Sequence, residues 1–145
     1  MTTAEHPKQD GKLRDLVRLT VPADYDAVAS ASDQISGALN QLNIPEQKRM
    51  EICLAVQEAL VNAVKHGCDN DATKNVSCLM QSRGDGQIII IVRDPGPGFD
   101  PSSIPDPKGD DNLHLSHGRG VYLIRQLMDE VRFNPTASEI RMWKY

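Results

Sequence analysis

Five consecutive apolar residues, Ile88-Ile89-Ile90-Ile91-Val92, constrain the fold of this chain more than any other stretch. They follow Arg83-Gly84-Asp85-Gly86, a pattern typical of a tight turn. Successive side chains of a strand point to opposite faces of the sheet, so this strand is apolar on both faces. We therefore expect residues 87–93 to form a central strand that pairs across the turn with the strand before it. Helices should cover it on at least one side.

The predicted strand leads directly into Asp94-Pro95-Gly96-Pro97-Gly98-Phe99-Asp100. An acidic side chain at a strand end offers a hydrogen-bond acceptor, and Gly96 and Gly98 would let a flat ring approach the backbone closely. The alternative interpretation is a plain turn rich in proline and glycine. The pattern alone leaves both interpretations open.

A long helix is predicted over residues 45–66, with Gly67 as its left-handed stop. Its apolar stripe consists of Ile52, Val56, Ala59 and Ala63. Glu58, Asn62 and His66 are spaced four residues apart and therefore lie along a neighbouring face. A carboxylate one turn before an amide can accept a proton and hold a cation. The alternative is a solvated helix face, on which His66 only stabilises the helix C-terminus.

A second glycine motif, His117-Gly118-Arg119-Gly120, precedes apolar residues at helical spacing. Glycines that open a helix leave its first amide groups free to face phosphate oxygens. The alternative is a pair of flexible glycines that end a loop. The preceding residues 101–116 contain three prolines and show no periodicity. Because long irregular loops are often functional, we interpret them as a mobile lid over a ligand.

The remaining segments complete a pattern of strands and helices. A helix is predicted over residues 23–42, with Asp24 as its N-cap. Strands are also predicted at residues 17–21, 76–81, 131–133 and 138–145. In the last of them, Ile140 and Met142 should face inward. The predicted order is strand, helix, helix, strand, strand, lid, helix, strand, strand, without internal repeats.

Composition limits the possible functions. The 145 residues fit one domain at residues 12–145, preceded by a polar flexible tail at residues 1–11. The formal net charge of -4 gives no broad positive field, which excludes direct binding to nucleic acid or to an anionic membrane. A small phosphorylated ligand is favoured instead. Without a signal peptide or a membrane span in the sequence, we expect a cytoplasmic protein whose three cysteines are reduced and mostly buried.

Three motifs stand in the chain in a fixed order. They are Glu58-x-x-x-Asn62-x-x-x-His66-Gly67, Asp94-x-Gly96-x-Gly98-Phe99-Asp100 and Gly118-Arg119-Gly120-x-x-Leu123-Ile124-x-x-Leu127-Met128-Asp129. Together they resemble the N, G1 and G2 boxes of the GHKL (Bergerat-fold, or HATPase_c) ATPases, which include gyrase, heat-shock chaperones and histidine kinases. In its short length and in the residues that make up the motifs, the chain is similar to the stand-alone anti-sigma-factor serine/threonine kinases of bacteria. The resemblance covers most of the chain from about residue 12.

The resemblance implies a fold and a function. The fold would be an α/β two-layer Bergerat sandwich, with a mostly antiparallel mixed sheet, helices on one face and the nucleotide between helices and lid. The function would be that of an anti-sigma factor that captures a sigma factor. It would also be an ATP- and Mg²⁺-dependent kinase that phosphorylates a serine or threonine of a STAS-type anti-anti-sigma antagonist. The resemblance also implies a homodimer, and an open-faced sheet needs a partner, which is consistent with a dimer or with a sigma-factor contact.

The resemblance also implies roles for single residues. Asp94 would accept the adenine amino group, and Gly96 and Gly98 would let the backbone close on the nucleotide. Asn62 would be the protein ligand to Mg²⁺, which suits a cation that keeps several waters. Glu58 would be the general base that activates the attacking hydroxyl.

At the phosphate end, Gly118 and Gly120 would place their amides on the phosphates, and Arg119 would add charge. His66 would also lie at the nucleotide. Whether Lys65, His66 and Arg119 touch phosphate or only stabilise helix ends stays open.

The sequence departs from the family at the last strand. Relatives usually carry a Gly-Thr pair where this chain has Ala137-Ser138, although Ser138 keeps the hydroxyl that faces adenine. The lid segment 108–116 is acidic and has a single glycine. We therefore expect ATP binding to be retained and kinase activity to be the more affected of the two.

Three alternative functions compete with this one. The first is a nucleotide-regulated binding module without kinase activity that acts on another partner. Glu58 argues against it, because nucleotide binding alone needs no base. The second is the ATPase half of a histidine kinase, which is disfavoured because we expect no dimerisation helix or phosphoacceptor His before the domain. The third, a structural protein without nucleotide, would require three coincidental motifs.

Overall fold

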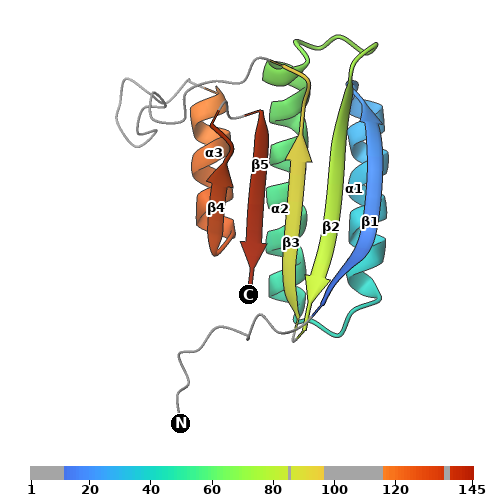
Figure 1. The fold of residues 1–145 in the computed structure, drawn as a ribbon, viewed down its shortest axis with the longest axis vertical. Helices are drawn as coiled ribbons and strands as arrows, with labels where there is room; N and C mark the ends of the chain where they lie inside the picture. Colours follow the sequence, from blue (N-terminus) through green and yellow to red (C-terminus); the bar gives the residue numbers. More distant parts are fainter. Residues whose placement is uncertain (1–11, 85, 97–115, 136–137) are drawn as a thin grey trace.

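The computed structural model describes residues 12–84, 86–96, 116–135 and 138–145 (Figure 1). In chain order, the elements are β1 (Leu13–Pro22), α1 (Tyr25–Asn40), α2 (Glu46–Asn62), η1 (Ala63–Gly67), β2 (Asn75–Arg83), β3 (Gln87–Arg93), α3 (Ser116–Leu127), β4 (Glu130–Phe133) and β5 (Glu139–Lys144). The predicted order of strands and helices is confirmed. The predicted tail at residues 1–11 and the predicted lid up to residue 115 lie outside the described residues.

The five strands form one sheet in the order β1-β2-β3-β5-β4. Every pairing between the described strands is antiparallel, so the predicted mostly antiparallel sheet is confirmed without a parallel pair among them. The apolar strand β3 lies at the centre, as predicted. Its Ile90 stands opposite Met80 of β2 and Met142 of β5.

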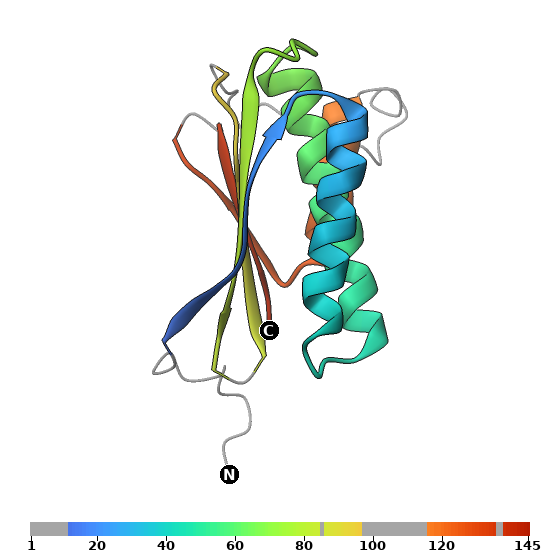
Figure 2. The same cartoon turned by 90° about the vertical axis from the view of Figure 1, so that its right-hand side faces the viewer.

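All three α-helices lie on the same face of the sheet (Figure 2). The core fills the space between the two layers, and its largest fully buried side chains include Ile35, Leu39, Ile52, Leu60, Met80, Ile88, Ile90 and Met142. These residues come from α1, α2 and the strand positions that face the helices. The opposite side of the sheet, which no described element covers, is called the open face below.

Local sequence signals explain several boundaries. Asp24 is the N-cap of α1, as predicted, and its Oδ1 accepts a hydrogen bond of 2.7 Å from the N–H of Ala27. Between β2 and β3, Gly84 and Gly86 take positive φ angles of 53° and 96°. Only glycine adopts such angles at no cost, so the predicted tight turn is confirmed.

The cysteines are all free thiols, and two of the three, Cys68 and Cys78, are buried. Burial raises the pKa of the Cys78 thiol to about 12. In the described part of the chain, no helix has the length and apolar character that crossing a bilayer requires.

Candidate nucleotide site

The end of α2 is wider than an ordinary α-helix. After Asn62 the chain continues as the π-helical turn η1, in which the N–H of Cys68 donates a 2.9 Å hydrogen bond to the carbonyl of Ala63, five residues earlier. Such turns are rare and occur frequently at functional sites. Lys65 and His66 lie in η1 and are exposed.

The predicted left-handed stop at Gly67 is wrong. The positive φ angles occur two and three residues later, at Asp69 (52°) and Asn70 (56°). The wide turn does not end at Gly67. It ends where the N–H of Asn70 donates a 2.9 Å hydrogen bond to the carbonyl of Val64. The glycine therefore serves another purpose than ending the helix.

Gly67 makes room for Asp94. A Cβ atom at Gly67 would lie 2.1 Å from Cγ of Asp94 and 2.4 Å from each carboxylate oxygen. A Cβ atom at Gly96 would in turn lie 2.2 Å from the carbonyl oxygen of Gly67. Neither position can hold a larger side chain in this arrangement. The end of η1, the end of β3 and the first glycine of the following turn are therefore in direct contact.

Asp94 is half-buried at this junction. Its Oδ1 accepts a hydrogen bond of 2.8 Å from the N–H of Gly96, and its own N–H donates to the carbonyl of Ser138 at 2.9 Å. Burial raises the pKa of the Asp94 carboxyl, and the hydrogen bond from Gly96 opposes that rise. The structure thus brings together Asp94 and Ser138, the two residues that the resemblance assigns to adenine.

On the helix side, Asn62 lies against α3. A Cβ atom at Gly120 would lie 2.5 Å from Nδ2 of Asn62 and 3.0 Å from its Oδ1. Gly120 is buried in the second turn of α3. The backbone amides of the first turn of this helix have no hydrogen-bond partner within it. The amide side chain of α2 and the positive end of α3 therefore meet at one place, which suits phosphate groups.

The comparisons with known proteins agree with this arrangement. Residues 21–144 match the family model of the histidine kinase-like ATPase domain. The chain belongs to the histidine kinase-like ATPase family.

Relatives of this ATPase domain include serine-protein kinases. The serine-protein kinase RsbW of Staphylococcus aureus (strain JH9) is 28% identical over 138 residues, which cover 90% of this chain and 87% of that protein. The serine-protein kinase RsbW of Staphylococcus epidermidis is also 28% identical, over 139 residues that cover 91% of this chain and 87% of that protein.

Two solved structures share the fold. The crystal structure of the RsbU and RsbW domains of Rv1364c from Mycobacterium tuberculosis aligns with a TM-score of 0.58 at 20% identity. That alignment covers 88% of this chain and 31% of the other. The histidine kinase domain of the blue-light activated histidine kinase EL346 from Erythrobacter litoralis aligns with a TM-score of 0.55 at 17% identity, covering 85% of this chain and 60% of that one. Both support the two-layer fold of the ATPase domain.

The other residues predicted for the site of this ATPase domain are placed as follows. Glu58 lies one turn before Asn62 on α2, and both are half-buried. Gly98 lies outside the described residues. For Gly118 and Arg119, only their position in the first turn of α3 is described.

The described residues fit a magnesium nucleotide. No group of three His, Cys, Asp or Glu side chains converges as metal ligands within them. Mg²⁺ often takes only one or two protein ligands and completes its shell with water and phosphate oxygens. The Asn62 amide beside the start of α3 has the chemistry of such a ligand, and the absence of a side chain at Gly120 leaves room for it.

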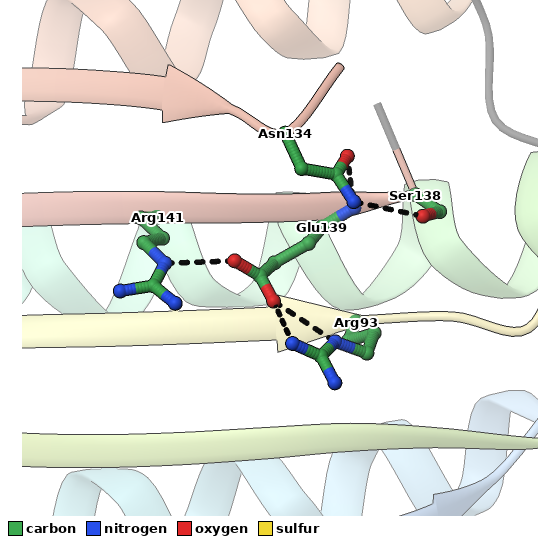
Figure 3. Close-up of polar contacts among 5 residues, drawn as sticks. All are labelled: Arg93, Asn134, Ser138, Glu139 and Arg141. Carbon is green, nitrogen blue, oxygen red and sulfur yellow. Dashed lines mark hydrogen bonds and ion pairs between the residues drawn. The ribbon is translucent and has the colours of Figure 1, made fainter. Parts of the chain in front are cut away.

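A cluster of charges next to Asp94 and Ser138 was not predicted. Glu139 of β5 lies between Arg93 of β3 and Arg141 of β5 on the open face (Figure 3). Its carboxylate accepts hydrogen bonds from Arg93 Nε at 2.9 Å, from Arg93 Nη2, and from Arg141 Nε at 2.7 Å. Burial acts to raise the pKa of Glu139, but the bonds and charges of Arg141 and Arg93 outweigh it and hold the pKa below its ordinary value.

The local sequence carries only part of this signal. Glu139 and Arg141 alternate with the inward Ile140 and Met142, which places the two charges on the open face. The partner Arg93 is 46 residues earlier, and only the register between β3 and β5 reveals it.

Proposed function

We propose that this chain is an anti-sigma factor with ATP-dependent serine/threonine kinase activity toward a STAS-type anti-anti-sigma antagonist. The observation that carries the proposal is the convergence of the three motifs. Asn62 meets Gly120, and Gly67 meets both Asp94 and Gly96, although these residues are far apart in sequence. The two staphylococcal relatives named serine-protein kinases support the choice of reaction.

At the adenine end, Asp94 accepts the amino group of the base, and the Ser138 hydroxyl contacts the same pocket. Their backbones are joined by a 2.9 Å hydrogen bond, so both groups have fixed relative positions. Gly96 and Gly98 let the backbone approach the ring. A half-buried carboxylate selects a base that presents N–H groups over one that presents a carbonyl, because an unpaired buried acceptor is costly.

At the phosphate end, the first-turn amide of Gly118 binds phosphate oxygens, Arg119 adds charge, and His66 lies at the nucleotide. Gly120 lies in the second turn of α3, where its N–H bonds within the helix, so its role is to leave room for Asn62. Asn62 is the protein ligand to Mg²⁺. When bound, the ion neutralises charge on the phosphates. The dipole of α3 acts in the same direction.

Glu58 is the general base. Its carboxylate accepts the proton of the substrate serine or threonine as the hydroxyl oxygen bonds to the γ-phosphorus. The bond from that phosphorus to the bridging oxygen breaks, and ADP leaves with the bonding electron pair. Because Glu58 is only half-buried, a protein substrate can reach it from solvent. Positioning and charge neutralisation supply most of the catalysis in phosphoryl transfer.

The proposal includes the partners and the compartment. The protein acts in the cytoplasm as a homodimer that binds a sigma factor and releases it when the antagonist competes. The rival function is a nucleotide-regulated binding module without kinase activity. The half-exposed Glu58, one turn from the proposed metal ligand, favours the kinase.

The first experiment is thermal melting with ADP and ATP, with and without Mg²⁺. A nucleotide at about 100 times its dissociation constant should stabilise the wild type by roughly 2.7 kcal/mol. Asn62→Ala should lose the Mg²⁺-dependent part of that shift. A wild type that does not respond, in melting or in direct titration, contradicts the nucleotide site.

The second experiment separates the kinase from the binding module. Phosphate transfer from labelled ATP to a STAS antagonist of the same genome is followed for the wild type, Glu58→Gln and Glu46→Gln. Glu46 is an exposed carboxylate at the other end of α2 and serves as the matched control. Glu58→Gln should bind ATP normally and transfer no phosphate. Phosphate transfer by Glu58→Gln at the wild-type rate would refute the role of Glu58 as general base. A wild type that binds ATP but transfers no phosphate would favour the rival function.

A further inference from the structure

We propose that Glu139 is a positioning residue for the adenine end of the site. It fixes β5 to β3 at the point where Ser138 and Asp94 leave the sheet. The inference rests on the proposed nucleotide site, because it concerns the placement of two adenine contacts. Glu139 itself faces away from the nucleotide and acts through its neighbours.

The link between the two strands is made by a buried carboxylate. The Glu139 side chain is 7% exposed, whereas those of Arg93 and Arg141 are 62% and 48% exposed. A carboxylate that is this little exposed depends on its partners for its hydrogen bonds, so removing one of them destabilises the local arrangement. Hydrogen bonds that involve an ionised group are about twice as strong as neutral ones. The carboxylate therefore holds Arg93 of β3 firmly in register with β5.

The two proposed adenine contacts, Asp94 and Ser138, are the chain neighbours of Arg93 and Glu139. Arg93 and Glu139 are directly opposite in the register, and Asp94 and Ser138 follow and precede them in the chain. The N–H of Asp94 bonds the carbonyl of Ser138 at 2.9 Å, which continues the ladder by one step. A shift of β3 relative to β5 would therefore move the carboxylate and the hydroxyl apart.

Ser138 is also held from the β4 side (Figure 3). Nδ2 of Asn134 donates to the Ser138 hydroxyl at 3.1 Å, and Oδ1 of Asn134 accepts from the N–H of Glu139 at 3.1 Å. One amide side chain thus spans both residues. With Glu139 fixed by the arginines and by Asn134, the hydroxyl of Ser138 has a defined direction, as positioned groups at a binding site require.

The test compares base selectivity in folded variants. Dissociation constants for ADP and GDP with Mg²⁺ are measured by calorimetry for the wild type, Glu139→Gln, Arg93→Gln and Asp15→Asn. Asp15→Asn is the matched control, because Asp15 pairs with Arg18 at 2.8 Å on the open face near the β2–β3 turn, at the other end of the sheet. Arg93→Gln breaks the same ion pair by changing an exposed side chain. This variant therefore tests the proposal even if Glu139→Gln fails to fold.

Glu139→Gln and Arg93→Gln should weaken ADP binding about tenfold, the effect of misplacing one hydrogen bond to a charged group. GDP binding should change little, so the preference for adenine should fall by about the same factor. A merely structural role would weaken both nucleotides equally. An unchanged preference in both folded variants, with a selective wild type, refutes the role of Glu139 alone. A wild type that binds neither nucleotide refutes the nucleotide site and this role with it.

Discussion

Replacing Gly120 with alanine puts a methyl group where the amide of Asn62 now lies. The new Cβ would be 2.5 Å from Nδ2 and 3.1 Å from Cγ of Asn62. Ordinary van der Waals contact begins at 3.4 Å, so the amide has to move by about 0.9 Å. Asn62 is only half-buried and can turn toward solvent. The variant therefore displaces the proposed Mg²⁺ ligand without removing it.

The expected effects on stability and on binding differ. Alanine is favoured over glycine inside a helix by roughly 0.5–1 kcal/mol, which offsets part of the crowding, so melting should change by only a few degrees. The Mg²⁺-dependent part of nucleotide affinity should fall about 10- to 100-fold, as it does when a metal ligand loses its support. Affinity measured without Mg²⁺ should change less than that.

Gly37→Ala is the control for this experiment. Gly37 lies in α1, and a Cβ there would meet nothing within 4 Å. It should stabilise the protein by roughly 0.5–1 kcal/mol and leave nucleotide binding unchanged. Calorimetric titration of ADP with and without Mg²⁺, together with melting curves, measures both effects. Gly120→Ala with wild-type Mg²⁺-dependent affinity would refute the reasoning, because it would show that Asn62 can move without loss.

Three further predictions follow from the ionisable groups. Asp94→Asn should melt at a higher temperature than the wild type at neutral pH. Burial raises the pKa of Asp94, so its ionised form destabilises the fold as pH rises. This gain in melting temperature should vanish in acid, and the variant should bind ADP more weakly. The pKa of Glu139 is lowered in the folded protein, so its ionised form contributes stability that is lost in acid. The difference in melting temperature between the wild type and Glu139→Gln should therefore shrink as pH falls below 4.5, the ordinary pKa of a glutamate. A difference that stays constant across that pH range would contradict the prediction. Cys78, with its pKa raised to about 12, should resist iodoacetamide in the native state at mildly alkaline pH and react only on unfolding, which mass spectrometry of the alkylated protein checks.

The central strand is the clearest case of what local sequence predicts. The apolar run that follows the glycine turn predicts a strand at residues 87–93, and β3 spans the same residues. The reason is that a strand apolar on both faces has few alternatives in a small domain. The Asp24 N-cap is a second case, because its hydrogen bond joins residues only three positions apart.

Contacts between distant segments are where sequence reasoning stops. Gly67 looks like a helix stop, but the structure explains it by the carboxylate of Asp94, which belongs to another element. Glu139 reads as an ordinary charge on the open face until the register brings Arg93 opposite. The motifs were recognised as a group by resemblance. Their direct contact, which depends on the packing of η1, β3 and α3, was visible only in three dimensions.

The π-turn at the end of α2 also fixes a count of residues. An α-helix turns by about 100° per residue, so inserting one residue between Asn62 and Gly67, where the turn is already wide, would rotate the glycine by roughly that angle. It would then no longer face Asp94, although every residue with a proposed role would still be present. A substitution at the exposed Lys65 should consequently be tolerated far better than an insertion in η1. The length of this segment is therefore as much a part of the site as any side chain in it.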